Sequence, residues 1–296
     1  MVERLLLCKD QAMCLPGTFH ALHHEPDAPP TRPDRPVGRL SRRATLAAAA
    51  VAAATVAVPA APAQAANHRR GSVGDLTHVF HVNFPLYAGD PPTRRTVSTI
   101  EDTGFYVQAW SFAEHIGTHL DAPGHVAPGG RLVPELDPEE MFAPIAVIDI
   151  SRRAEQDPDA MVEVRDLRDY EHRHGRIPDR AAVYMYSGWD RKVHDPNAYR
   201  NSGPDGRLHF PGFGLEAVEW LLEQRRILAL GVDTLSLDIG ASTTFPVHKR
   251  LLGADRYGLE NLANLGQIPP SGAEAVVGIV PWEEGSGGPC RVLARW

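Results

Sequence analysis

The chain has 296 residues, 43% of them hydrophobic, which is enough to bury one sizeable core. Its formal charge is −7, and it becomes −9 when residues 1–65, with seven Lys/Arg and five Asp/Glu, are set aside. This acidic balance argues against a nucleic-acid-binding surface.

The N-terminal segment differs in composition from the rest of the chain. Arg42 and Arg43 precede an Ala/Val run that reaches Val58, and Ala-Gln-Ala at 63–65 follows. A twin arginine, a weakly apolar run and a small-residue end are typical of a twin-arginine export signal. The run is short and proline interrupts it, so it is a poor membrane-spanning helix. We therefore expect a secreted or extracytoplasmic protein with no stable membrane anchor.

These features predict a leader and signal peptide over residues 1–65, a short linker over 66–72 and one domain over 73–296. Removal of the leader leaves Cys290 as the only cysteine. No intrachain disulfide is then expected, although an exported protein could hold one.

Local patterns after residue 72 predict strands and helices in a mixed order. Runs rich in Val, Ile and aromatic residues are typical of strands, and apolar residues at helical spacing predict helices. The expected strands are Thr77–Val82, Thr93–Ile100, Tyr106–Phe112, Ile145–Ile150, Ala182–Tyr186, Ile227–Val232, Ala275–Ile279 and Arg291–Ala294. The expected helices are Val164–His174 and Leu215–Arg225, with short pieces at Val247–Leu252 and Leu259–Leu265. The mixture predicts an α/β fold.

The densest group of metal-binding residue types is His115, His119, Asp121 and His125. Imidazole and carboxylate groups bind divalent metals and handle protons near neutral pH. All four positions are odd, so in an extended chain the side chains point to one face. Two histidines and one aspartate would supply the three protein ligands of a catalytic Zn²⁺ site, with a fourth position for water.

A straight backbone cannot bring these side chains together. In a strand, His115 and Asp121 would lie about 20 Å apart, too far to share one ion. In a helix, Asp121 would lie off the face that the first two histidines share. The chain is therefore predicted to bend, and Gly117 and Pro123 are the residues that allow it.

His248 and Glu260 could complete the ligand set. A continuous helix would separate them by about 18 Å, but the segment from Gly253 to Gly258 is typical of a turn that returns the chain. A surface histidine and a glutamate at the start of a helix are the alternative interpretation, and the residues alone leave both open.

The metal motif resembles a known signature. His115-x-Gly-Thr-His119-x-Asp121-x-Pro-x-His125 is similar to the signature of the cyclase family of metal-dependent hydrolases, which includes bacterial kynurenine formamidase and isatin hydrolase. Other segments are also similar to family segments, over about residues 73–284: Asp75-Leu-Thr-His, Pro85–Asp90, Ser187-Gly-Trp189, Gly231–Asp238 and His248 with Glu260-Asn-Leu.

The resemblance implies a single-domain swivelling β/β/α fold and a homo-oligomer, either a dimer or a tetramer. It also implies one or two divalent ions, Zn²⁺ first and Mn²⁺ as the alternative. The implied metal ligands are His115, His119, Asp121, His248 and Glu260. His125 resembles the proton-transfer histidine of the family, and a neutral imidazole with a reference pKa of about 6.5 suits that work.

We therefore expect an exported metal-dependent hydrolase of a small amide, cyclic amide or lactone-like carbonyl. Export fits poorly with cytoplasmic tryptophan breakdown, which disfavours the formamidase reaction itself. The alternatives are a metal-dependent cyclase or dehydratase of secondary metabolism and a non-catalytic metal-containing binding protein. Tyr87, Trp110 and Trp189 can either wall an aromatic pocket or pack in the core. His78 and His81 are interpreted as structural.

Overall fold

The computed structural model describes residues 71–296. The expected signal peptide at 1–65 and the two arginines within it lie outside the described residues. The described residues fall into two units. One contains Ile100–Gly104, in which α1 (Ile100–Thr103) is a single helical turn, and the other contains residues 71–99 and 105–296.

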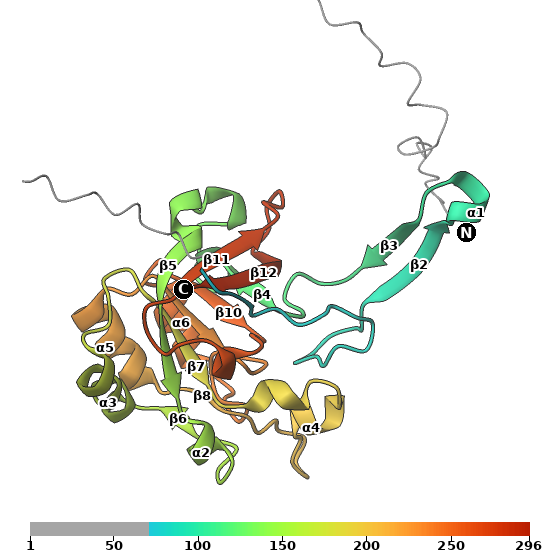
Figure 1. Ribbon diagram of the computed structural model, residues 1–296. Helices are drawn as coiled ribbons and strands as arrows, with labels where there is room; N and C mark the ends of the chain where they lie inside the picture. Colours follow the sequence, from blue (N-terminus) through green and yellow to red (C-terminus); the bar gives the residue numbers. More distant parts are fainter. Residues whose placement is uncertain (1–70) are drawn as a thin grey trace, which may run out of the picture. The chain divides into compact units, whose positions relative to one another are not determined.

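Within the larger unit, seven strands close into a mixed barrel (Figure 1). Each strand in the following order pairs with the next, and the last pairs with the first. The order is β12 (Gly287–Arg295), β11 (Glu274–Ile279), β5 (Phe142–Asp149), β7 (Ala182–Tyr186), β9 (Ala229–Val232), β10 (Tyr257–Glu260) and β4 (His119–Asp121). The neighbours β5, β7, β9 and β10 are parallel, and the other pairings in the ring are antiparallel. The fold is therefore α/β, as the mixed sequence pattern predicts.

The remaining elements are short or flank the barrel. β1 (Val73–Asp75) pairs with the last three residues of β12, on the edge opposite β11. Two further pairs, β2 (Thr93–Ser98) with β3 (Val107–Ser111) and β6 (Met161–Val162) with β8 (Gly212–Phe213), form small separate sheets. The helices are α2 (Ser151–Ala154), α3 (Val164–His174), α4 (Pro196–Arg200), α5 (Leu215–Arg225) and α6 (Pro246–Leu252), and 3-10 turns cover Pro123–His125, Val133–Glu135, Pro138–Met141, Trp189–Lys192 and Leu265–Gln267.

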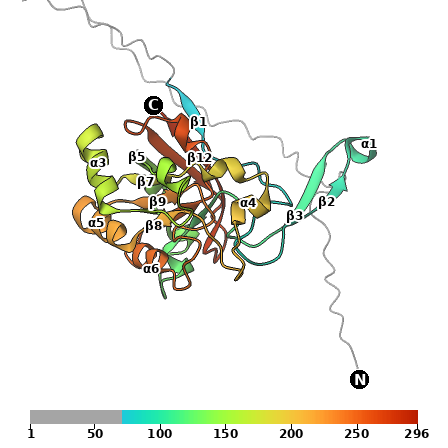
Figure 2. The ribbon, with the colours of Figure 1, turned by 90° about the horizontal axis from the view of Figure 1, so that it is seen from below.

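The central strands are apolar on both faces, which explains their near-continuous hydrophobic sequences. In β7, Ala182 and Tyr184 point into the barrel interior, whereas Val183 and Met185 face the helices. Alternate residues of a strand point to opposite sides, so one run supplies two cores. Figures 1 and 2 show α3, α5 and α6 together on one side of the barrel.

Two predicted elements are wrong. Residues 77–82 form no strand but only a single bridge from Thr77 to Leu262, because the Thr77 side chain bonds the backbone of Val292 instead of extending a ladder. The helix expected over Leu259–Leu265 is instead the end of β10 followed by a loop. Asn261 in that loop has a φ of +55°, which no helix tolerates. No helix within residues 71–296 is both long and apolar enough to cross a membrane.

The packing of helix α5 against the barrel can be tested with two leucine variants of that helix. Leu221 is fully buried against the barrel, whereas Leu215 on the same helix is 37% exposed. Leu221→Ala should lower the free energy of unfolding by about 2–5 kcal/mol, because it leaves a cavity. Leu215→Ala should cost about 1 kcal/mol or less. Urea unfolding followed by circular dichroism measures both, and equal losses would contradict this packing.

Candidate metal centre

The pairing of β4 with β10 brings distant polar residues together. In this antiparallel register Glu260 lies directly opposite His119, and Gly258 lies opposite Asp121. Directly opposed residues share a face of the sheet, so the Glu260 carboxylate joins the side of β4 that carries His119 and Asp121. His248 is added from α6, which the turn at Gly253 separates from β10.

The resulting cluster is tight and almost fully buried. His119 Nε2 lies 3.3 Å from Asp121 Oδ1 and 3.4 Å from Glu260 Oε2. His248 Nε2 lies 3.0 Å from Glu260 Oε1 and 3.6 Å from Asp121 Oδ2. His115 Nδ1 approaches Asp121 Oδ1 at 2.6 Å. The structure thus gathers the five residues that the family resemblance implies as metal ligands.

The backbone bends at the two predicted positions. Gly117 has a φ of +69°, and a Cβ there would lie 2.7 Å from the ring of Phe80, so only glycine fits. After β4, Pro123 starts a 3-10 turn that ends at His125. This turn brings His125 back over the motif, with its ring centroid 3.7 Å from that of His115.

The histidine rings are oriented by their second nitrogens. His119 Nδ1 lies 2.9 Å from the Gly117 carbonyl oxygen. His248 Nδ1 lies 2.7 Å from Asp238 Oδ2, and the Asp238 carboxylate also accepts the backbone N–H of Val247 and His248 at the start of α6. Each Nε2 therefore points into the cluster, the arrangement found for metal-ligating histidines.

Burial and charge act against each other at this site. Burial disfavours the charged ring of His119, but the carboxylates of Asp121 and Glu260 outweigh it and raise its pKa to about 9. Burial disfavours the charged ring of His248 as well, but the nearby carboxylates of Asp121, Asp238 and Glu260 outweigh it and raise its pKa. Burial raises the pKa of Asp121, but His119 and the other ring contacts hold it well below the usual value.

His125 behaves differently from the other histidines. Burial of its inner side lowers its pKa to about 4, and the opposing effect of Asp121 is smaller. The ring is therefore neutral at pH 7, and it is the most exposed of the three histidines in the motif. A neutral, accessible imidazole can accept a proton, and a pKa of about 4 makes this ring a weaker base than a free imidazole.

The donor set fits a divalent cation. Asp121 Oδ2 is buried and has no hydrogen-bond partner in the described part of the chain, which leaves a charged oxygen unsatisfied. Two groups of ligand atoms, each within 4.8 Å of one another, share Asp121. They are His119 with Asp121 and Glu260, and His115 with Asp121 and His125. Nitrogen and oxygen donors of this kind suit Zn²⁺ or Mn²⁺.

The cluster forms one wall of a cavity of about 560 Å³. Leu86, Tyr87, Ile116 and Phe245 supply an apolar lining, and the Tyr87 and Phe245 rings meet edge to face with centroids 5.8 Å apart. Of the three aromatic residues weighed in the sequence, Tyr87 alone lines this cavity. Trp189 is buried in a core cluster under the loops, and Trp110 packs its ring against Phe80.

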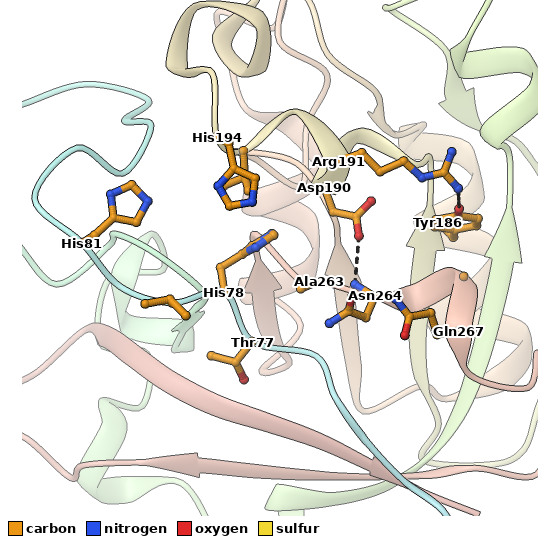
Figure 3. A pocket seen from close by; sticks show the side chains of 13 residues that line it. Thr77, His78, His81, Tyr186, Asp190, Arg191, His194, Ala263, Asn264 and Gln267 are labelled. Atoms are coloured by element: carbon orange, nitrogen blue, oxygen red, sulfur yellow. Dashed lines mark hydrogen bonds between the residues drawn. The ribbon is translucent and has the colours of Figure 1, made fainter.

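A second cavity, of about 440 Å³, contains the two histidines near the start of the domain (Figure 3). His78 and His81 line it with Asp190 and His194, and neither of the first two joins the metal cluster. Thr118 links the segments around the two sites, since its Oγ1 accepts the backbone N–H of His78 and donates to the carbonyl of Asn261.

Sequence reasoning missed several contacts around the cluster. Ser286, in a glycine-rich loop without a recognisable motif, places its Oγ 3.0 Å from His115 Nε2 and donates to Glu114. Asp238, which the sequence marks only as the end of a family-like segment, orients the ring of His248. Asp233 belongs to neither group of candidate ligand atoms among the described residues, and its carboxylate accepts the backbone N–H and the hydroxyl of Ser187.

Comparison with known proteins agrees with this geometry. The model of the family described as "Putative cyclase" matches residues 74–239. The isatin hydrolase of Roseibium aggregatum is 31% identical over 240 residues, which cover 75% of this chain and 90% of that protein. The kynurenine formamidase of Erythrobacter litoralis is 26% identical over 225 residues, covering 75% and 93%.

Solved structures give the same result. Isatin hydrolase A from Ralstonia solanacearum aligns with a TM-score of 0.72 and 37% identity, over 76% of this chain and 92% of that one. An isatin hydrolase bound to the product analogue thioisatinate aligns with a TM-score of 0.72 and 30% identity, over 76% and 92%. The family match covers more than half of the chain, and the relatives are matched over most of their length. The chain therefore belongs to the putative cyclase family.

Proposed function

We propose that this protein is a metal-dependent hydrolase that opens the amide bond of a small cyclic amide. The observation that carries the proposal is the buried cluster of His119, Asp121 and Glu260 in the wall of a cavity, with the neutral His125 beside it. Relatives named isatin hydrolase and kynurenine formamidase support this reaction class, since both names denote cleavage of a non-peptide C–N bond.

We propose His115, His119, Asp121, His248 and Glu260 as the ligands of one or two divalent ions, Zn²⁺ or Mn²⁺. When bound, such an ion lowers the pKa of a water molecule and polarises the carbonyl under attack. Asp121 belongs to both groups of ligand atoms, so two bound ions would share its carboxylate.

The protein's own residues handle the proton and orient the substrate. The neutral ring of His125 accepts a proton from the attacking water and returns it to the leaving nitrogen. Tyr87 and Phe245 offer aromatic surfaces on which a planar ring can pack beside the cluster. This lining favours a bicyclic or aryl-fused lactam over an extended chain.

Further expectations from the sequence remain proposals. We propose that the domain over 73–296 has the swivelling β/β/α topology, which the closed barrel with its helices on one side supports. Export through the twin-arginine pathway rests on the sequence pattern of residues 1–65. A dimer or tetramer rests on the family resemblance alone.

The reaction is tested with purified protein loaded with Zn²⁺ or Mn²⁺. Isatin should be opened to its amino-carboxylate product faster than N-formylkynurenine or a simple lactone is cleaved. In ¹⁸O-labelled water the product should carry one labelled oxygen, because hydrolysis takes its oxygen from solvent. A product without label would favour a cyclase or dehydratase, and inactivity on the whole panel with metal bound would favour a binding protein.

Two histidine variants distinguish a metal ligand from a general base. His119→Ala should lower both metal content and rate, since it removes a ligand from the cluster. His125→Asn should keep the metal and reduce the rate about 10²–10⁴-fold, the usual contribution of general acid–base catalysis. Elemental analysis and initial rates on the same preparations measure both effects. Loss of metal from His125→Asn equal to that from His119→Ala would make His125 a ligand.

The number of bound ions is tested with variants of His248 and Glu260. If two ions bind, His248→Ala and Glu260→Ala should each lower the metal content by about one ion per chain. His209→Ala is the control, because its ring bonds Asp159 outside the cluster. A His248 variant with unchanged metal content and rate would exclude that residue from the site.

A further inference from the structure

Asn261 connects the end of β10 to Gly117 and Thr118, the two residues of the metal motif that precede β4. It directly follows Glu260, is 2% exposed and has a φ of +55°. The register of β10 with β4 places it beside Thr118, whose Oγ1 donates to the Asn261 carbonyl at 2.6 Å. The Asn261 side chain then reaches Gly117, and its Nδ2 donates to that carbonyl at 2.9 Å.

The Gly117 carbonyl oxygen therefore carries two contacts. One is Asn261 Nδ2 and the other is His119 Nδ1, each at 2.9 Å. The second contact sets the angle of the imidazole, because it leaves Nε2 pointing at Asp121 and Glu260. Any movement of the Gly117 peptide would turn the ring of His119 with it.

The orientation of the Asn261 amide is itself fixed. Its Oδ1 accepts the hydroxyl of Tyr199 at 3.0 Å, and Tyr199 is fully buried. A flipped amide would set its oxygen against the Gly117 carbonyl oxygen, which can only accept, and would lose this bond. The Tyr199 hydroxyl, which also lies 3.1 Å from the Asp233 carbonyl oxygen, can donate or accept and does not decide the orientation by itself. The backbone N–H of Asn261 also donates to Thr234 at 2.9 Å. The amide thus presents a fixed donor to Gly117.

We infer that Asn261 is a positioning residue for His119, which it orients through the carbonyl of Gly117. The inference rests on the metal site of the proposed function. Outer contacts of this kind hold a ligand in the geometry that the ion requires, and their loss costs about 10–100-fold in metal affinity.

Two substitutions remove the donor while respecting the backbone. Asn261→Gly accepts a positive φ and deletes the side chain. Asn261→Asp is nearly the same shape and keeps an acceptor for Tyr199, but it has no N–H for Gly117.

Asn264→Gly is the matched control. Asn264 also has a positive φ, of +58°, and its Nδ2 also donates to a backbone carbonyl, that of Asp75, at 2.9 Å. It lies at the second cavity (Figure 3), outside the metal cluster.

The affinities for Zn²⁺ and Mn²⁺ are measured by competition with a chelator, without substrate, beside thermal unfolding of the metal-free proteins. Both Asn261 variants should bind metal at least about 10-fold more weakly than the wild type. Asn264→Gly should bind within about twofold of the wild type, even if it unfolds at a similar temperature to the Asn261 variants.

Unchanged affinity in both folded Asn261 variants would overturn the inference. So would loss of the fold in both while Asn264→Gly stays folded, because Asn261 would then serve the fold and not the ligand. A wild-type protein that binds metal but hydrolyses no substrate would count against the proposed reaction alone. A wild-type protein that binds no metal would remove the proposed site and this inference together.

Discussion

The site and the barrel both depend on the antiparallel pairing of β4 with β10. This pairing helps close the ring of strands, and it sets Glu260 opposite His119. A slip of one residue would turn Glu260 to the other face of the sheet and move the hydrophobic set of β10 with it. The buried Leu120 and Leu259, which face each other in this register, fix it from the core side. Hydrophobic packing thereby positions a group of polar residues that could not be held in place by their own interactions.

The polar cluster is costly to bury. Asp121, Asp238 and Glu260 are all 5% exposed or less, and carboxylates removed from water need a compensating positive charge. The raised pKa of His119 shows that imidazolium can supply that charge. A divalent cation does so more effectively, since it would contact several oxygens at once and displace the ring protons. Stability and metal binding are therefore coupled through the same side chains.

Local sequence patterns predict some elements closely and others not at all. The bounds of α3, α5 and β7 agree with the sequence prediction, because the apolar residues of the two helices recur at helical spacing and β7 is a short apolar run. The bend of the motif follows from Gly117 and Pro123, which constrain the backbone wherever they occur. The three-residue β4 and the end of β10 were not predicted, since their strand character comes from pairing across the barrel. The contacts of Ser286 and Asn261 could not be predicted for the same reason: their partners lie 171 and 144 positions away.

The position of β12 in the ring bears on the order of events during synthesis. β12 pairs with β1, β11 and β4, so the ring stays open until residues 287–295 have left the ribosome. His115 and His119 emerge long before β10 and β12, the strands that flank β4 and cover the cluster. While the segment between β4 and β10 is being made, the nascent chain therefore carries exposed histidines and an unpaired β4 edge, open to the wrong metal and to aggregation. Such a topology favours closure of the barrel after its other strands have been made, and it gives chaperones a defined interval in which to act.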